Sequence, residues 1–198
     1  MPHKVQPMLV ALLGLCSALL TSAFEFLEVR LEWEVFVQLA PPLIFGGVLA
    51  AYFRGREQRV SVWRAAVFVA LCIAAYFISM LLAVRLFLAF LRVHWTNSVR
   101  IPFGVSFAAG FVGAFIVLGA GLFLFGPGNV DWQSIARLFG CALVGGVLGI
   151  PGLRAHEYFQ SRFLLFAVWE TGVALCLGFM LSREQPDADG SLSDLQGG

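Results

Sequence analysis

Long apolar runs are the feature of this sequence that most restricts its fold. An α-helix needs about 20 apolar residues to cross the roughly 30 Å hydrocarbon core of a bilayer. Five runs meet or approach that length, and they cover residues 8–27, 35–53, 65–84 with an extension to 91, 101–125 and 163–181. A sixth run, residues 135–150, is short at 16 residues and fits a thin or tilted crossing. We therefore expect about six membrane crossings.

The same runs decide the fold class. Hydrophobic residues make up 60% of the chain and charged residues only 13%, which is more apolar side chain than a soluble domain of this size needs. The runs lack the period-two alternation of a transmembrane barrel. Backbone groups that meet no water must form their hydrogen bonds within a helix. We predict an all-α, polytopic integral membrane helix bundle of about six transmembrane helices.

One transmembrane domain is expected over residues 1–183, followed by a polar tail, residues 184–198, whose Asp, Ser and Gly content predicts disorder. Lys4, the first apolar run and Thr21-Ser22-Ala23 resemble a secretory signal with its cleavage site. Because that run is long enough to span a bilayer, we expect it to be retained. The net charge of +1 gives no case for nucleic acid. Small size, compact loops and the lack of an organelle signal favour the bacterial inner membrane, with the lipid bilayer as the first partner.

The sequence around Trp33 is similar to that around Trp132, which indicates an internal duplication. Residues 32–49 align without a gap with residues 131–148, and six positions are identical. Repeats over residues 8–91 and 101–181 would hold three helices each, and an odd number of crossings inverts the second copy. Many transporters and channels use such a 3+3 inverted repeat and place their sites at the repeat interface. Chance similarity between apolar segments is the alternative.

Basic residues give a first estimate of orientation. With the N-terminus inside, seven Lys and Arg residues fall on inner segments and six on outer ones, so the positive-inside rule does not decide. The basic loop at residues 54–64 favours an internal N-terminus for the first half. Arg85, Arg92 and Arg100 then lie outside. A rival model makes residues 65–91 a re-entrant segment and returns these arginines to the cytoplasm.

Glu170 is the sharpest candidate for a functional side chain, because it lies inside the apolar run 163–181. Carboxyl groups at membrane depth are costly and usually face a bundle interior or a wet cavity. Glu170 should be protonated or paired with a cation, and it can act as a proton or cation site or as a substrate counter-charge. A purely structural hydrogen bond between two helices is the alternative. Arg85 is a candidate partner if the depths match, although its side chain can instead extend to the interface.

Pro41 and Pro42, followed by Gly46 and Gly47, predict a break in the second helix. Proline removes an amide donor and clashes with the preceding turn. Carbonyl groups freed at membrane depth need protein or water as partners. A discontinuous helix would line a path through the membrane, whereas a kink would only shape helix packing.

Polar residues near the helix ends form a further group. Gln38 and Arg137 occupy equivalent repeat positions one turn before the predicted break, and they complete the candidates for a transport or ion path. Arg and Glu residues three apart predict ion pairs at two helix ends. The candidates at the membrane interface are Arg54, Glu57, Arg154, His156 and Glu157.

Small residues at helical spacing predict close helix packing. Gly145 and Gly149 form a GxxxG pair, and such pairs let two helix backbones approach. The matching faces on the run 101–125 are built from Ser106, Gly110 and Gly113. These faces can serve packing within one chain or a homodimer.

Signatures of enzymes, cofactors and metals are missing. The chain has no HExxH, GxSxG or P-loop motif, and its three histidines are scattered. Its four cysteines form no CxxC pair and are expected to be free thiols. We expect no cofactor and no metal.

Three function classes follow. The leading hypothesis is a small transporter or channel for a small solute or ion, with Glu170 in its last helix. The second is a non-catalytic subunit or assembly factor of a larger membrane complex, which would bind other membrane subunits. The third is a membrane enzyme acting on lipid, with interfacial arginines holding head groups.

Overall fold

The computed structural model describes residues 5–28, 34–56, 60–94, 102–126, 130–159 and 162–182. Within these ranges the chain forms six α-helices and no strand, which confirms the all-α membrane bundle expected from the sequence. The helices are α1 (Pro7–Glu28), α2 (Glu34–Arg56), α3 (Val62–His94), α4 (Phe103–Phe125), α5 (Trp132–Phe159) and α6 (Arg162–Ser182).

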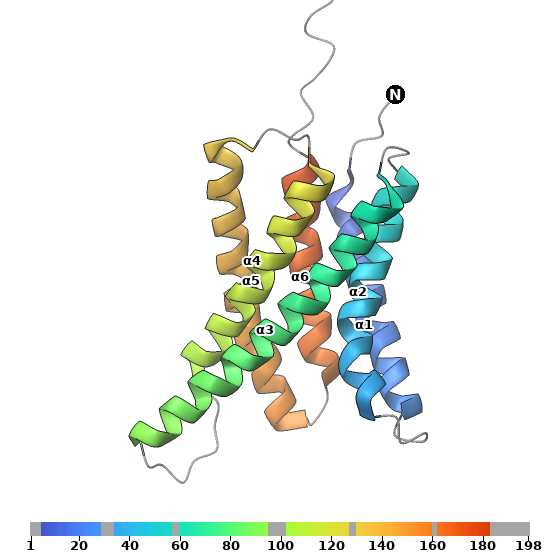
Figure 1. The fold of residues 1–198 in the computed structure, drawn as a ribbon. Coiled ribbons are helices and arrows are strands. Elements are labelled where there is room, and N and C mark those ends of the chain that lie inside the picture. Colours follow the sequence, from blue (N-terminus) through green and yellow to red (C-terminus); the bar gives the residue numbers. More distant parts are fainter. Residues whose placement is uncertain are drawn as a thin grey trace, which may run out of the picture.

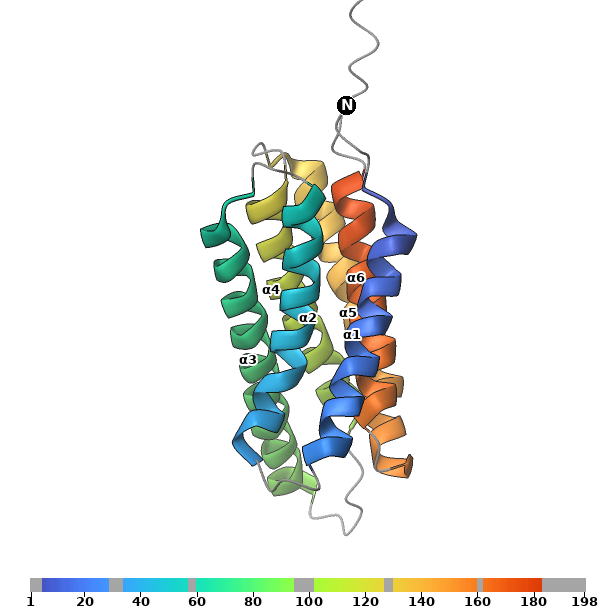
Figure 2. The ribbon, with the colours of Figure 1, turned by 90° about the vertical axis from the view of Figure 1, so that its right-hand side faces the viewer.

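The helices run up and down in alternation and close into a ring. Each helix packs on the next one along the chain, and α6 returns to pack extensively on α1. Figure 2 shows α1 and α6 side by side along their length. Helix α1 begins and α6 ends at the same end of the bundle (Figure 1), which we call the proximal end. At the opposite, distal end, α4 and α6 begin.

The outer surface is apolar. Five helices, α1, α3, α4, α5 and α6, contain stretches of the described chain that are long and apolar enough to cross a membrane. Helix α2 lies beside α1 and α3 over the same height (Figure 2). Large side chains such as Leu12, Leu81 and Val147 are more than half exposed on the outside of the bundle. Since such side chains are stable against hydrocarbon rather than water, the chain is a multi-pass membrane protein.

The structure corrects the expected length of the sixth crossing and excludes one alternative for the third. Helix α5 is not a short crossing, because it runs for 28 residues through Pro151, and its apolar part, Trp132–Pro151, has 20 residues. Helix α3 is one continuous helix of 33 residues, so the re-entrant alternative fails as well. At 1.5 Å per residue α3 is about 50 Å long, well beyond the core of a bilayer. It crosses the face of the bundle obliquely (Figure 1).

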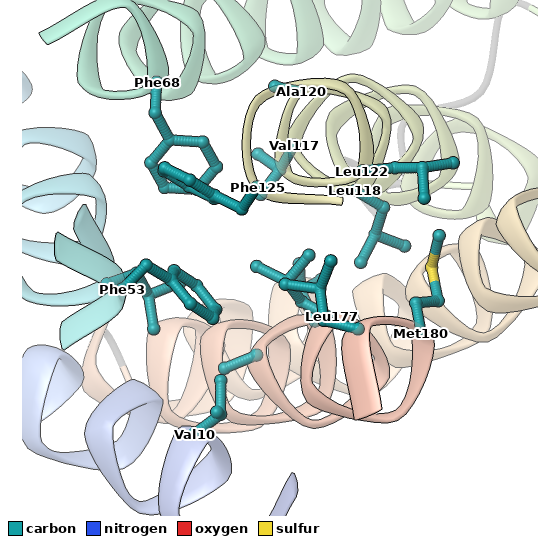
Figure 3. Close-up of a cluster of buried hydrophobic side chains, with 14 of the residues drawn as sticks. Val10, Phe53, Phe68, Val117, Leu118, Ala120, Leu122, Phe125, Leu177 and Met180 are labelled. Atoms are coloured by element: carbon teal, nitrogen blue, oxygen red, sulfur yellow. The ribbon is translucent and has the colours of Figure 1, made fainter. Parts of the chain in front are cut away.

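A cluster of phenylalanines fills the proximal half of the bundle. Phe53 of α2 stacks on Phe125 of α4 with ring centroids 4.8 Å apart, and Phe68 of α3 lies 5.0 Å from the same ring. Leu177 and Met180 of α6 lie in the same cluster (Figure 3). These side chains come from four helices, so they hold the proximal half together by close packing.

Small residues bring α4 and α5 into backbone contact. A Cβ on Gly110 would lie 2.7 Å from the carbonyl oxygen of Gly145 and 3.1 Å from the Cα of Gly149. A Cβ on Gly149 would lie 2.8 Å from the carbonyl oxygen of Ser106. The GxxxG face is therefore used inside one chain. Gly113 faces elsewhere, since its Cβ would meet the hydroxyl of Ser79 on α3.

Candidate functional site

A cavity of about 330 Å³ lies between α2, α3, α4 and α6, with one contact from α5. Its walls include Ser106, the fourth residue of α4, and Phe166, the fifth residue of α6. Both helices begin at the distal end, so the cavity lies in the distal half of the bundle, opposite the phenylalanine cluster. Its volume is at the low end of the range for small-molecule sites, roughly 300–1,000 Å³.

Glu170 lines this cavity from α6. Its side chain is only 2% exposed, and it lies about 12 Å along the helix from the distal start at 1.5 Å per residue. The hydroxyl of Ser17 on α1 lies 2.5 Å from Oε2 of Glu170. The two helices approach closely here, because a Cβ on Gly14 would lie 2.8 Å from the carbonyl oxygen of Glu170. Glycine at position 14 thus lets Ser17 reach the carboxyl group.

The Ser17 hydroxyl has two acceptors but one proton. It lies 2.7 Å from the carbonyl oxygen of Gly14 as well as 2.5 Å from Glu170. An ionised Glu170 can only accept, so Ser17 must then donate to it. A protonated Glu170 can donate to Ser17, which leaves the Ser17 proton for Gly14. The same atoms therefore satisfy both protonation states of the carboxyl group without a change of fold.

Aromatic side chains line the same cavity as the carboxyl group. Phe45 of α2 and Trp169 of α6 line the cavity with ring centroids 6.3 Å apart. The indole N–H of Trp169 donates to the carbonyl oxygen of Gly110 at 3.4 Å, which fixes the direction of the ring. Tyr76 of α3 and Phe166 of α6 complete the aromatic lining. The cavity therefore offers several π-faces close to one carboxyl group.

Polar groups are few in this cavity. Within the described ranges, Glu170 is the single acidic residue of the lining, and none of the lining residues is Lys, Arg or His. The hydroxyl oxygen of Ser79 is buried and has no hydrogen-bond partner within the described part of the chain. A buried hydroxyl without a partner is costly, so Ser79 is a ready contact for a polar group of a ligand. Cys72 and Tyr76 are the other titratable side chains of the lining.

The two prolines of α2 line the cavity without interrupting the helix. Helix α2 is continuous from Glu34 to Arg56, so the predicted discontinuity is wrong. Neither Pro41 nor Pro42 has an amide hydrogen, and the carbonyl groups four residues before them lose their helical donors. Both prolines are buried. Gly46, one turn beyond the prolines, packs against Cys72, whereas Gly47 faces open space.

The most exposed part of the cavity lining lies on α3. Met80 and Val84 of α3 line the cavity and are 43% and 47% exposed, more than the other lining side chains. Pro41 of α2, on another wall, is fully buried. The mouth of the cavity therefore lies on the α3 side, where the exposed Arg85 follows Val84.

The structure brings together one part of the sequence-predicted set. Glu170 and the proline pair line one cavity with small residues of the α4–α5 contact. The small residues of the lining that the sequence analysis named are Ser106, Gly110 and Gly149. Candidates that were chosen from separate segments therefore meet at one place.

The basic candidates lie elsewhere. Arg85 is exposed and is not part of the cavity lining, so Ser17 and not Arg85 is the partner of Glu170. Arg137 bonds the side-chain oxygen of Gln133 on its own helix at 3.3 Å, and Arg54 is exposed at the end of α2. The side chains of Gln38, Glu57, Arg154, His156 and Glu157 lie outside the described residues.

Sequence reasoning missed four contributors to the site, namely Ser17, Tyr76, Ser79 and Trp169. Ser17 and Ser79 are hydroxyls within apolar runs, which is a visible but weak signal. Trp169 directly precedes Glu170, and the pair on one helix turn was available as a sequence feature. All four cysteines are free thiols, as expected.

Comparison of the chain with protein families, with characterised proteins and with solved structures finds no match.

Proposed function

We propose that this protein is a small membrane transporter that moves a small solute or ion across the bilayer, with Glu170 as its binding group. The observation that carries the proposal is the position of Glu170, which is buried at membrane depth on the wall of a cavity. An ionisable residue at such a depth is costly, and in transporters it marks the path of a substrate or proton. A purely structural carboxyl group would not need a cavity beside it.

The unequal filling of the two halves of the bundle supports this proposal. The cavity occupies the distal half, whereas Phe53, Phe68 and Phe125 fill the proximal half. Alternating access requires one side to be closed while the other is accessible. In this proposal the phenylalanine cluster is the closed side, and it separates when the cavity changes sides.

The Ser17–Glu170 contact supports coupling to protons. Both protonation states of Glu170 find hydrogen-bond partners at Ser17 and Gly14, as described above. A carboxyl group that can lose and regain a proton in place is suited to exchange a proton for a substrate. We propose that Glu170 performs this exchange.

The inverted repeat belongs to this proposal as its architecture. In such a repeat, α1, α2 and α3 correspond to α4, α5 and α6. The contact of α1 with α6 then corresponds to the contact of α4 with α3. Both contacts are extensive, and α1 runs opposite to α4 (Figure 1). The cavity lies where helices of both triplets meet, as in inverted-repeat transporters.

Reconstituted vesicles test the transport proposal. The protein is placed in liposomes that contain a pH-sensitive dye, and organic cations, amino acids and sugars are added to the outside one class at a time. We expect at least one class to drive proton movement through the wild type and none through Glu170→Gln. Asp131→Asn removes an exposed carboxyl group outside the cavity and should retain the flux. A wild type that gives no solute-dependent flux with any class contradicts the proposal.

A subunit role is the second candidate, and the exposure of α3 favours it. The candidate span of α3 is the least buried of the five spans. Its exposed outer side chains include Ile78, Leu81 and Leu88, which a helix of another membrane subunit could cover. Purification in mild detergent should then yield a stoichiometric partner, whereas a single pure species with flux activity favours transport.

A further inference from the structure

We propose that the ligand of this cavity is a small amphipathic organic cation, an amine or quaternary ammonium on an apolar body, and that it enters sideways from the hydrocarbon of the bilayer. This inference rests on the proposed function in one respect: it takes the molecule that binds in the cavity to be the molecule that is transported. Binding itself is a separate property and can be measured without transport.

The charge of the described lining selects a cation. Among the residues that the structure describes, Glu170 is the single carboxyl group of the lining, and no basic side chain lines the cavity to hold an anion. Within a low-dielectric interior one uncompensated carboxylate strongly favours a positive partner. The carboxylate is left with acceptor capacity beyond its bond to Ser17, since a carboxylate offers about four lone-pair sites.

The aromatic rings select an organic cation over a metal ion. Phe45, Tyr76, Phe166 and Trp169 line the same cavity as Glu170. Ammonium groups are attracted to the faces of such rings, most strongly where water is excluded. A metal cation such as Ca²⁺ instead needs roughly six to eight oxygen ligands. The mostly apolar lining of this cavity does not supply that number.

The remaining walls fit the apolar body of the ligand. Pro41, Pro42, Ala83 and Leu165 contribute hydrocarbon surface. The Ser79 hydroxyl, buried and without a partner among the described residues, can accept one hydrogen bond from a protonated amine, whereas a quaternary ammonium has no N–H and relies on the carboxylate and the rings. A ligand with one polar end and an apolar remainder therefore matches the lining better than a sugar or an amino acid, which need more polar contacts.

The exposure of Met80 and Val84 gives the route. These two side chains line the cavity and are exposed. The exposed residues near them on α3 are the apolar Ile78 and Leu81 and the basic Arg85. Amphipathic cations partition into bilayers, so they are concentrated where this mouth opens. The flexible thioether of Met80 can move aside with little strain.

Binding of radiolabelled benzyltrimethylammonium to the wild-type protein in lipid nanodiscs tests the proposal. Its uncharged isostere neopentylbenzene has the same shape, with carbon in place of the ammonium nitrogen, and benzenesulfonate carries the opposite charge. We expect saturable binding that neither competitor displaces. Equal displacement by neopentylbenzene, or no saturable binding, overturns the proposal. This measurement needs no variant and so does not depend on the folding of a mutant.

Variants then locate the site. Glu170→Gln should weaken the binding by about 30-fold or more, because it removes one member of a desolvated charge pair. Glu170→Asp keeps the charge and should keep the preference for the cation, and Asp131→Asn should bind as the wild type does. Unchanged binding in Glu170→Gln overturns the assignment. Val84→Trp narrows the mouth and should slow association more than it changes affinity.

The two proposals fail separately. Saturable cation binding that depends on Glu170, without flux in vesicles, keeps the ligand class and overturns transport. Flux of another solute class without cation binding keeps transport and overturns the ligand class.

Discussion

Ser17 on α1 and Glu170 on α6 are 153 positions apart in the chain, yet their side-chain oxygens lie 2.5 Å from each other. The contact joins the helix that begins the ring to the helix that closes it. Glycine at position 14 makes the approach possible, because a side chain there would meet the Glu170 backbone. The Glu170 carboxyl group, which is costly to bury, thereby contacts the Ser17 hydroxyl on one side and borders the cavity on the other.

Loss of the Ser17 hydroxyl should destabilise the bundle. Ser17→Ala leaves the buried carboxyl group without its donor, and an unsatisfied buried polar group costs about 1–3 kcal/mol. Unfolding in mixed detergent micelles, followed by circular dichroism, measures the change in the free energy of unfolding.

Ser22→Ala is the matched control, because within the described part of the chain the Ser22 hydroxyl bonds to the carbonyl oxygen of Ala18 on its own helix and to no other helix. It should change stability by less than about 0.5 kcal/mol. A double-mutant cycle with Glu170→Gln should give a coupling energy above about 0.5 kcal/mol between positions 17 and 170. Equal effects of the two alanine variants, or additive effects in the cycle, would show that the Ser17–Glu170 bond contributes nothing to stability.

Gly110→Ala should separate α4 from α5. The added Cβ would lie 2.7 Å from the carbonyl oxygen of Gly145, and such overpacking costs about 1–3 kcal/mol. Gly140→Ala is the control on α5, since no atom lies within 4 Å of a Cβ there. That control should be neutral or more stable than the wild type by up to about 1 kcal/mol. The same unfolding assay checks both, and a stable Gly110→Ala would contradict the close packing of these helices.

Asp131 should stabilise α5 in a pH-dependent way. The hydroxyl and the backbone amide of Ser134 donate to its carboxylate, the amide at 2.8 Å, and they lower the pKa of Asp131 below its ordinary value. A lowered pKa in the folded state means that the stabilisation is present above the ordinary aspartate pKa. It is lost as the pH falls through the lowered folded value.

Asp131→Ala should therefore be less stable than the wild type at neutral pH, and the difference should vanish in strong acid. Asp131→Asn, which can still cap the helix, should show no such pH dependence. Unfolding measured from pH 7 downwards checks this. A difference between wild type and Asp131→Ala that stays constant with pH would rule out the charged cap.

Labelling of single cysteines should place the starts of α3 and α4 on opposite sides of the membrane. Ser61→Cys and Gly104→Cys are introduced into a background without Cys16, Cys72, Cys141 and Cys176. An impermeant maleimide should label Gly104→Cys from outside and leave Ser61→Cys protected, because the basic residues near the end of α2 favour the cytoplasm. Labelling of both from the same side would contradict the up-and-down topology.

The helices themselves were predictable from hydropathy. The predicted run 8–27 differs from α1 by one residue at each end, and the run 101–125 differs from α4 by two residues at its start and none at its end, because the length of an apolar run directly sets the length of a crossing. The run 135–150 predicted too short a helix, because the charged residues after Pro151 end the apolar run although α5 continues through them. A helix that leaves the hydrocarbon core can carry such residues without cost.

The candidate site was predictable only in part. Glu170 stands out because a carboxyl group in an apolar run is costly, and Pro41 and Pro42 stand out because of their chemistry. Their partners depend on helix rotation and on pairing across the ring, which no local pattern contains. Arg85 was therefore a plausible partner by depth, although Ser17 is the actual one. The hydroxyl of a serine gives almost no signal in hydropathy, so its role is visible only once α1 lies against α6.

The contact of α1 with α6 can form only after the last helix has been synthesised. Ribosomes deliver helices to the membrane in sequence, so α1 is in place long before its most extensive contact is synthesised. During that interval the hydroxyl of Ser17, fully buried in the finished bundle, lacks its contact with Glu170. Glu170 enters the membrane with the last helix, and its insertion is supported by the Ser17 hydroxyl of a helix that is already in place. The ring of helices therefore closes only when the final helix is complete. A nascent chain arrested before Glu170 would lack the contact that closes the ring.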